Sequence, residues 1–356
     1  MSKLTVLMQR LPDSADAAMI ISRPNRRYYL GLDSHDAGLL FVTRKKAYFI
    51  IDFRYIETAR AKVKDAEVLL QEDIAAQLRD LCKRHNVKTV AVETGALTLR
   101  EYARFQTMLL SVKLSTENEL DNVILKQRAV KTEDEIVLLK EAQRLTDATF
   151  AYIVDRIAPG RTEKEVALDM EFYMRSQGAE AVSFDFIVVA GKNSSLPHGV
   201  PGDNRLCTGD FVTMDFGATV DGYHADMTRT VALGSVSEEQ RAVYDTVLKA
   251  QLAVLGILKA GVKCNEMDKI ARDIIDAAGY KGCFGHGLGH SVGIEIHEGP
   301  RFSSSCHEEA PAGTVMTVEP GIYLEGRFGV RIEDTGVLTD TGFDNFMTSP
   351  KELLIL

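Results

Sequence analysis

The chain has 356 residues, which is long enough for two hydrophobic cores, so we expect two domains. Its net charge of −9 argues against non-specific nucleic-acid binding, which needs a basic patch to neutralise phosphates. No apolar run approaches membrane-spanning length, and the first residues (MSKLTVLMQRLPDS) lack the apolar core of a signal peptide, so we expect a cytoplasmic protein. The five cysteines include no CxxC pair, and we expect them to be reduced thiols.

The first third of the chain predicts an α/β domain. Apolar runs predict strands at Ala18–Ile21, Gly38–Val42, Ala47–Ile51 and Thr89–Val92, with a helix at Ile74–His85. The ionisable residues of this part have no ligand-like spacing, so we interpret them as structural. The segment Glu117–Val130 is predicted to connect this domain to the rest of the chain.

Two capping boxes open the second part of the chain. The first, Thr132 to Glu135, begins a long helix that we expect to reach Pro159-Gly160, and the second, Thr162 to Glu165, begins a helix that ends at Gly178. A similar unit returns 101 residues later, because Gly160, Glu165 and Gly178 correspond to Gly261, Glu266 and Gly279, and Ile153 and Ile157 to Val254 and Leu258. We therefore hypothesise an internal duplication that gives two halves, each of helices and strands.

The segment Phe211–Val231 predicts a hairpin that carries two carboxylates. If Asp221-Gly222 forms a two-residue turn, residue 220 faces 223, 217 faces 226 and 215 faces 228. Asp215 and Asp226 are then diagonal neighbours on one face, roughly 7–8 Å apart at the backbone, and Gly217 opposite Asp226 leaves room there. A metal ion could bridge the two carboxylates, but a hairpin face wetted by solvent explains this stretch equally well.

Six of the eight histidines lie between positions 198 and 307. Three of them are in the glycine-rich run Gly285–His297, where glycines allow the backbone to approach what the imidazoles face. Apolar neighbours of His290 and His297 predict that this run is buried. The alternative is a glycine-rich loop with solvated histidines.

Two glutamates lie in apolar strand-like runs. Glu319 is in Thr314–Tyr323 and Glu333 is in Val330–Val337, and a buried carboxylate must be paired or bound to a metal. A surface pair with Arg331 is the alternative for Glu333. Four carboxylates and one imidazole suit more than one hard divalent ion, such as Mn(II), better than structural zinc, and two ions can hold a hydroxide and polarise a carbonyl. The predicted reaction class is hydrolysis by the set Asp215, Asp226, His290, Glu319 and Glu333.

The order of these residues resembles a known family. Asp215, Asp226, GHGLGH, VEPG and RIED follow one another as in the M24 metallopeptidases of the "pita-bread" fold, which include methionine aminopeptidases, aminopeptidase P and prolidase. The resemblance implies an α/β (α+β) protein with a creatinase-like N-terminal domain at residues 1–125 and a pita-bread catalytic domain with pseudo-twofold halves at residues 126–356. Two divalent ions are implied, most typically Mn(II), with Co(II) or Zn(II) as alternatives.

The resemblance also implies a role for each site residue. Asp215 would chelate one ion, His290 and Glu319 the other, and Asp226 and Glu333 would bridge. His198, in LPHG, and His297, in IHEGP, would stabilise the tetrahedral intermediate and transfer protons, with Glu319 as acid and base. His286 and Arg331 would support the ligands, and Tyr323 and Arg301 would contact substrate.

The creatinase-type first domain and the segment His297–Pro300 indicate the proline-specific branch of the family. We therefore expect an exopeptidase that cleaves Xaa-Pro bonds in dipeptides or at the N-terminus of short peptides, with no nucleic-acid or membrane partner, and family precedent implies a homodimer. Alternatives are a non-catalytic binding protein of the same fold, a creatine amidinohydrolase, and an aminopeptidase of other specificity. The first two are disfavoured because all five ligand positions are intact. Arg301 is either a clamp for the dipeptide carboxylate or a solvated loop residue.

Overall fold

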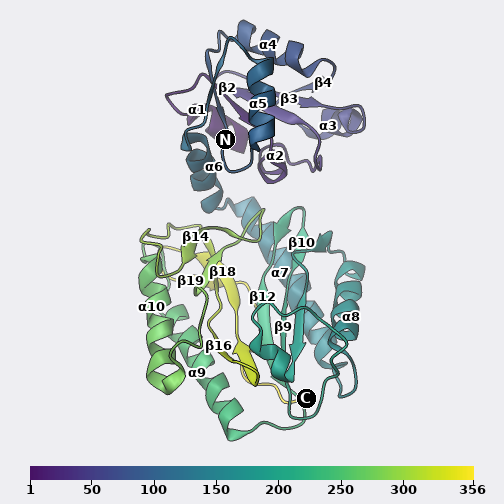
Figure 1. Ribbon diagram of the computed structural model, residues 1–356, viewed down its shortest axis with the longest axis vertical. Coiled ribbons are helices and arrows are strands. Elements are labelled where there is room, and N and C mark those ends of the chain that lie inside the picture. Colours follow the sequence, from purple (N-terminus) through teal and green to yellow (C-terminus); the bar gives the residue numbers. More distant parts are fainter. The chain divides into compact units, whose positions relative to one another are not determined.

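The computed structural model describes residues 1–356 and contains two compact units, Met1–Arg128 and Ala129–Leu356 (Figure 1). No helix in either unit has the length and apolar character needed to cross a membrane.

The first unit is built on one mixed sheet of six strands in the order β4-β3-β2-β1-β5-β6. The three antiparallel strands at its centre are buried along their whole length, which explains their continuous apolar runs. They are β1 (Ala17–Ile20), β2 (Leu39–Thr43) and β3 (Ala47–Ile51), and the parallel strands beside them are β4 (Glu67–Leu70), β5 (Thr89–Val92) and β6 (Lys113–Ser115).

The six helices of this unit are mostly short. They are α1 (Lys3–Gln9), α2 (Arg23–Leu30), α3 (Ile56–Lys62), α4 (Ile74–Arg84), α5 (Leu99–Met108) and α6 (Glu119–Ala129). The predicted strands and the helix from Ile74 are present, with ends within about two residues. The short helices α1, α2 and α3 and the strands β4 and β6 were not predicted, and the predicted connector contains the helix α6.

The second unit has two halves of the same kind. The first half contains α7 (Glu133–Val154), α8 (Glu163–Ser176), β7 (Ala181–Val182), β8 (Ile187–Ala190), the 3₁₀ turn η1 (Gly191–Ser195), β9 (Phe211–Phe216), β10 (Ala218–Val220), β11 (Tyr223–His224) and β12 (Met227–Ala232). Both predicted capping boxes are formed, but α7 ends at Val154, before the predicted stop at Pro159.

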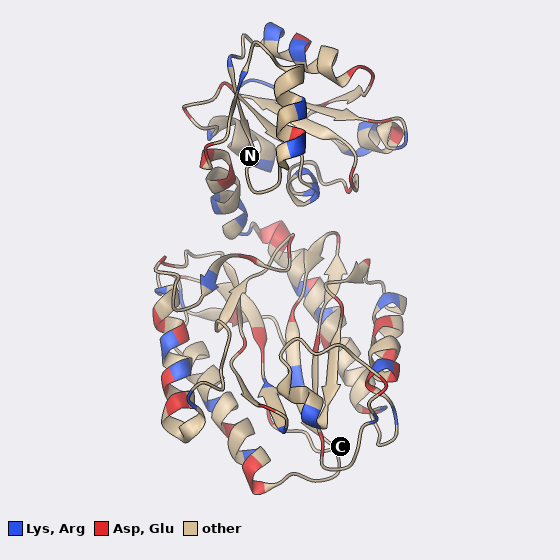
Figure 2. Cartoon of the chain, in the orientation of Figure 1, with Lys and Arg blue, Asp and Glu red and all other residues tan.

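The second half repeats the order of two helices followed by strands. It contains α9 (Glu238–Leu255), α10 (Cys264–Ile275), the short π-helical turn η2 (Asp276–Tyr280), β13 (Gly289–Ser291), β14 (Glu298–Phe302), β15 (Val315–Val318), β16 (Gly321–Leu324), β17 (Phe328–Arg331), β18 (Asp334–Leu338) and β19 (Phe343–Asn345). In Figure 1, α8 and α10 lie on opposite sides of the strands. Figure 2 shows acidic and basic residues alternating along these two helices, as in the pair Glu171–Arg175.

The hypothesis of an internal duplication is supported in detail. Five buried positions of α7, α8 and the turn between them have buried counterparts 101 residues later, and each set lies in the core of its own half. The pairs are Ile153 and Val254, Ile157 and Leu258, Val166 and Met267, Met170 and Ala271, and Met174 and Ile275. The turns between the helices also make equivalent hydrogen bonds. Gly160 N–H donates to the carbonyl oxygen of Leu206, and Gly261 N–H donates to that of Ala310.

The hairpin around Asp221-Gly222 has the predicted register. Val220 pairs with Tyr223 and Asp215 with Thr228, and both turn residues have positive φ, as a type I′ turn requires. The prediction that Gly217 leaves room was wrong. A Cβ at Gly217 would lie 1.8 Å from the carbonyl oxygen of Ala225, so the backbone occupies that space, and each strand of the hairpin is interrupted there.

The sheets of the second unit consequently contain short strands that change partners. The four sheets have the orders β11-β10-β7, β12-β9-β8, β14-β13-β15-β18-β19 and β16-β17. Two predicted continuous strands are also divided. Thr314–Tyr323 is divided at Glu319 into β15 and β16, and Val330–Val337 is divided at Glu333 between β17 and β18.

A buried ion pair joins the first residues of the second unit to its largest sheet. Lys131 Nζ lies 3.1 Å from Glu298 Oε2 and donates to Ser291 Oγ at 2.9 Å, and both charged side chains are almost completely buried. Ser291 and Glu298 face each other across β13 and β14, at a bulge in the ladder. One ammonium group therefore links β13, which bears His290, to the start of β14, directly after His297.

We expect Lys131→Met to lower the free energy of unfolding by about 3–5 kcal/mol, because it leaves the Glu298 carboxylate buried without its cation. The double variant Lys131→Met/Glu298→Gln should recover a large part of that loss. Urea denaturation measures both effects. The exposed pair Glu141–Arg144 is the control, since Arg144→Ala should leave the midpoint almost unchanged. A double variant less stable than Lys131→Met alone would contradict this account.

Candidate active site

The five predicted ligands come from both halves of the second unit, and three of them lie where a strand is interrupted. Asp215 is on β9 and His290 is on β13. Asp226 lies between β11 and β12, Glu319 between β15 and β16, and Glu333 between β17 and β18. Each interruption removes the residue from the regular alternation of a ladder, so its side chain need not point to a face of the sheet.

Three of these side chains form one buried cluster. One ligand atom from each of Asp226, His290 and Glu333 lies within 4.8 Å of the other two, and the three residues are 5%, 9% and 1% exposed. His290 Nε2 is 3.5 Å from Asp226 Oδ2 and 3.4 Å from Glu319 Oε1, so Glu319 borders the same space. This arrangement of carboxylate and imidazole groups can hold a divalent cation.

Two carboxylate oxygens at this site have no hydrogen-bond partner. They are Asp215 Oδ1 and Glu333 Oε1, and both are buried. An unsatisfied buried carboxylate oxygen carries a large desolvation cost. A divalent cation would satisfy both atoms, and so the residues present fit a metal.

The mutual repulsion of the carboxylates changes their proton affinities. Burial, followed by the negative charges of neighbouring carboxylates, raises the pKa of Asp226 and of Glu333 well above the ordinary range. Burial also raises the pKa of Glu319 to about 8, although the nearby Arg331 lowers it. Binding a cation must therefore displace protons from the cluster.

The imidazole of His290 is held in one orientation. Its Nδ1 is 3.1 Å from the carbonyl oxygen of Ser291 and donates to it, which leaves Nε2 with its lone pair toward Asp226 and Glu319. Burial, followed by the proximity of the His297 imidazole, lowers the pKa of His290 to about 3. A neutral, oriented imidazole is the form that binds metals.

Arg331 does not pair with Glu333, so the predicted alternative of an Arg331–Glu333 surface pair was wrong. Its Nη2 donates to Asp215 Oδ2 at 2.6 Å and its Nε donates to Thr228 Oγ1 at 2.9 Å. Thr228 Oγ1 in turn donates to Glu333 Oε2 at 2.8 Å. One buried guanidinium thus orients two carboxylates, one of them through a hydroxyl group.

Tyr323 and His286 continue this network. Arg331 Nη1 donates to the Tyr323 hydroxyl at 2.8 Å, and the hydroxyl donates to His286 Nε2 at 2.9 Å. His286 Nδ1 donates to the carbonyl oxygen of Gly287 at 2.8 Å, so both ring nitrogens have partners. Burial lowers the pKa of His286 to about 4. The imidazole is therefore neutral, and its ring is fixed from both sides.

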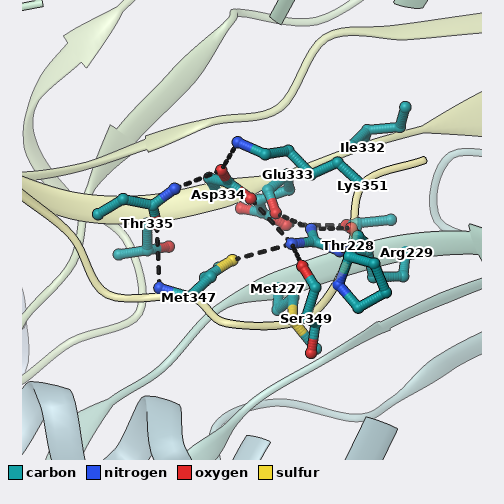
Figure 3. Close-up of polar contacts among 12 residues, drawn as sticks. Met227, Thr228, Arg229, Ile332, Glu333, Asp334, Thr335, Met347, Ser349 and Lys351 are labelled. Carbon is teal, nitrogen blue, oxygen red and sulfur yellow. Dashed lines mark hydrogen bonds and ion pairs between the residues drawn. The ribbon is translucent and has the colours of Figure 1, made fainter. Parts of the chain in front are cut away.

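A second buried arginine, Arg229, contacts the segment that bears Glu333 and Asp334 (Figure 3). Arg229 Nη2 donates to Asp334 Oδ1 at 2.9 Å, and Nη1 donates to the carbonyl oxygen of Glu333. Asp334 Oδ2 also accepts from Asn345 and Lys351. The backbone at Glu333 is therefore held by a charged network. The sequence analysis missed Arg229, although a charged residue inside the apolar strand Met227–Ala232 was the same signal that identified Glu319.

The remaining predicted site residues are exposed. His297 was expected to be buried, but only its neighbour His290 is; the two rings meet edge to face, with centroids 4.5 Å apart. Partial burial, followed by the positive charge of Arg301, lowers the pKa of His297. Arg301 is exposed on β14, and its Cα pairs with that of His290. His198 is exposed one residue after Pro197, whose carbonyl oxygen accepts from Arg331 Nη1 at 3.3 Å.

Comparison with known proteins shows similarity along the whole chain. The model of metallopeptidase family M24 matches residues 137–340, and that of the creatinase/prolidase N-terminal domain matches residues 1–130. An uncharacterized peptidase of Bacillus subtilis, YqhT, is 41% identical over 342 residues, which are 96% of each chain.

Two solved structures are also similar. An Xaa-Pro dipeptidase from Bacillus anthracis has a TM-score of 0.94 at 38% identity, over 99% of this chain and 98% of that one. An X-Pro aminopeptidase from Thermotoga maritima has a TM-score of 0.91 at 36% identity, over 98% and 99%.

The raised carboxyl pKa values predict an unusual pH dependence for the metal-free protein. Folded Glu319, with a pKa of about 8, keeps a proton that an unfolded glutamate has lost, as do Asp226 and Glu333. The folded state then binds more protons, so its stability falls as pH rises toward 8. His286 and His290 act in the opposite sense only below their unfolded pKa of 6.5.

We therefore expect the urea midpoint of EDTA-treated protein to fall between pH 6.5 and 8.5. Protein saturated with Mn(II) should not show this fall, because metal binding strengthens as the ligands lose protons. The same titration with both samples measures the difference. If the urea midpoint of the chelated protein is constant or rises over this range, the pKa values of the buried carboxylates are not raised in the folded protein.

Proposed function

The chain belongs to metallopeptidase family M24, and from this premise we propose that it is a metal-dependent exopeptidase that hydrolyses Xaa-Pro peptide bonds. The observation that carries the proposal is the buried cluster of Asp226, His290 and Glu333, bordered by Glu319. The similarity to an Xaa-Pro dipeptidase and to an X-Pro aminopeptidase supports the choice of substrate. The test is hydrolysis of Ala-Pro and Ala-Pro-Ala before chelation, after chelation, and after Mn(II) is restored.

We propose that the site holds two divalent ions, with Mn(II) as the preferred metal. His290 and Glu319 would bind one ion and Asp215 the other, with Asp226 and Glu333 bridging. Asp215 Oδ1 and Glu333 Oε1, which have no hydrogen-bond partner, support the assignment of these two residues as ligands. When bound, such ions polarise a substrate carbonyl and lower the pKa of water.

The protein groups around the ions would position the substrate and move protons. We assign Glu319, which borders the cluster 3.4 Å from His290 Nε2, to accept and return a proton as the acid and base of the reaction. His198 and His297 are exposed imidazoles on different segments, and we assign them to stabilisation of the tetrahedral intermediate and to proton transfer. The Tyr323 hydroxyl is engaged by Arg331 and His286, which favours a positioning role over direct substrate binding through that group.

Arg301 is proposed to distinguish dipeptides from longer peptides. Its side chain is exposed, and its backbone lies opposite that of His290 in the β13–β14 ladder. A dipeptide has a free carboxylate directly after the proline, and a guanidinium can bind it through two charge-assisted hydrogen bonds. We favour a dipeptidase on this ground, with an aminopeptidase that cleaves before proline as the second candidate.

Location and assembly are also proposals. All five cysteines are free thiols, which supports a reducing compartment such as the cytoplasm. A homodimer is proposed from the family resemblance, and sedimentation of the purified protein would test it.

We expect Asp226→Asn and Glu333→Gln to abolish hydrolysis of Ala-Pro and to lower bound metal, because each removes a charge from the shared cluster. The chain should stay folded, since both substitutions also reduce the repulsion between buried carboxylates. Metal analysis and circular dichroism accompany the assay. A variant that is active with full metal content would exclude the residue from the site.

We expect Arg301→Ala to raise KM for Ala-Pro much more than for Ala-Pro-Ala, whose carboxylate lies one residue further away. We expect KM for Ala-Pro to rise on the order of tenfold or more, because a hydrogen bond to a charged group contributes about 1.5–3 kcal/mol. Arg327→Ala, an exposed arginine paired with Glu239, is the control and should change neither KM. Equal effects on both peptides, or none, would favour the aminopeptidase.

A further inference from the structure

One fully buried carboxylate of the second unit lies outside the proposed active site. Glu163 is the first residue of α8 and has no exposed surface. It lies outside the metal cluster, and the sequence analysis treated its neighbourhood only as a helix start. A buried anion needs compensation from hydrogen bonds or a cation, so its partners are informative.

The carboxylate of Glu163 is bound entirely by neutral donors. Oε1 accepts from Ala190 N–H at 2.8 Å and from the side-chain amides of Asn193 and Asn204 at 3.0 Å each. Oε2 accepts from Gly202 N–H at 3.2 Å and lies 3.4 Å from the Asn193 amide. Its position in the first turn of α8 adds the favourable field of the helix N-terminus.

These donors lie on both sides of His198 in the sequence. Ala190 and Asn193 precede it, and Gly202 and Asn204 follow it. The backbone of α8 also binds the residues that follow His198, because Glu163 N–H donates to Asn204 O at 3.0 Å and Lys164 N–H donates to Gly202 O at 3.1 Å. A single carboxylate therefore forms hydrogen bonds with both ends of the segment 190–204.

We propose that Glu163 is a positioning residue that holds His198 in its working place; this inference rests on the proposed function. The exposed imidazole of His198 stands on a segment whose ends are fixed by Glu163 and whose middle is held by the bond from Arg331 to Pro197 O. Freeing the ends allows His198 to occupy other positions, and poorly oriented groups lose catalytic effect steeply. The predicted metal ligands lie outside the segment 190–204, so we expect the loss of Glu163 to affect His198 more than metal content.

Glu163→Gln isolates this role because it keeps the size of the side chain. Glutamine has a single acceptor oxygen, and its amide group is a donor. If that oxygen faces Ala190 N–H, the amide faces Gly202 N–H, and the reverse orientation exposes Ala190 N–H to the same conflict. Backbone donors cannot turn away as the two asparagine side chains can. At least one end of the segment is therefore released.

The experiment uses the full-length protein loaded with Mn(II), with Ala-Pro as substrate. We expect Glu163→Gln to lower kcat by on the order of tenfold or more, with metal content retained and a much smaller change in KM. In a His198→Ala background the same substitution should have almost no further effect, because both changes remove one function. A full, independent effect in that background, or no effect in the wild type, would overturn the proposal.

Glu93→Gln is the matched control for general loss of stability. Glu93 is also a buried carboxylate bound by neutral donors, namely Ile21 N–H, Ser22 N–H, Ser22 Oγ and the Asn25 amide, but it lies in the first unit. It should lower the melting temperature and leave kcat unchanged. If Glu163→Gln does not fold, Asn193→Ala removes one donor only, and it should lower kcat in the same non-additive way with His198→Ala.

A second measurement separates this proposal from the proposed function. Histidine resonances of the metal-free protein, with His198 identified by its loss in His198→Ala, report the local order of each ring. Glu163→Gln should broaden or shift the His198 resonance and leave that of His286 unchanged. An unchanged His198 resonance would refute the positioning role even if the protein proved inactive on Xaa-Pro peptides. Absence of Xaa-Pro hydrolysis by the wild type would refute only the proposed function.

Discussion

The rest of the second unit depends on the cost of placing several carboxylates together in a buried site. Two unit charges 4.8 Å apart repel by about 3–4 kcal/mol at the effective dielectric of a protein, whereas an ordinary hydrogen bond contributes only about 1 kcal/mol. Hydrogen bonds alone therefore cannot hold Asp226 and Glu333 together in charged form, and Glu319 borders the same space. Protons or divalent cations must compensate, and the raised pKa values describe the first of these states.

The surrounding architecture keeps these groups close against their repulsion. Arg331 is bound to Asp215 directly and to Glu333 through Thr228, while Arg229 and Asp334 hold the backbone behind Glu333. On the histidine side, Lys131 joins Ser291 to Glu298 and so fixes the two strands next to His290 and His297. Each support is itself buried and charged, so loosening one leaves another charge uncompensated.

The sequence predicted features that depend on local chemistry. The Asp221-Gly222 dipeptide gave the hairpin register, the two threonine caps gave the starts of α7 and α8, and the rule that a buried carboxylate needs a partner identified Glu319. Features set by tertiary contacts were not predictable. The strand interruption at Gly217 is required by the approach of the Ala225 carbonyl, and the partner of Arg331 is 116 residues away. Glu163 gave no signal, because its acceptor role depends on donors 27 to 41 residues further on.

The two halves share a scaffold, as the hypothesis of a duplication predicts, and they differ at a position that bears on the proposed chemistry. Glu163 and Cys264 occupy equivalent positions, 101 residues apart, and both donate a backbone hydrogen bond of 3.0 Å, to Asn204 O and Glu308 O respectively. Only the first half has a carboxylate at this position. The Glu163 side chain accepts hydrogen bonds from both ends of the segment that bears the exposed His198. The Cys264 thiol is buried and has a raised pKa, so it cannot supply that anion. The matched buried positions thus account for the similar packing of both cores, while Glu163, which has no carboxylate counterpart in the second half, is the residue that we propose positions His198.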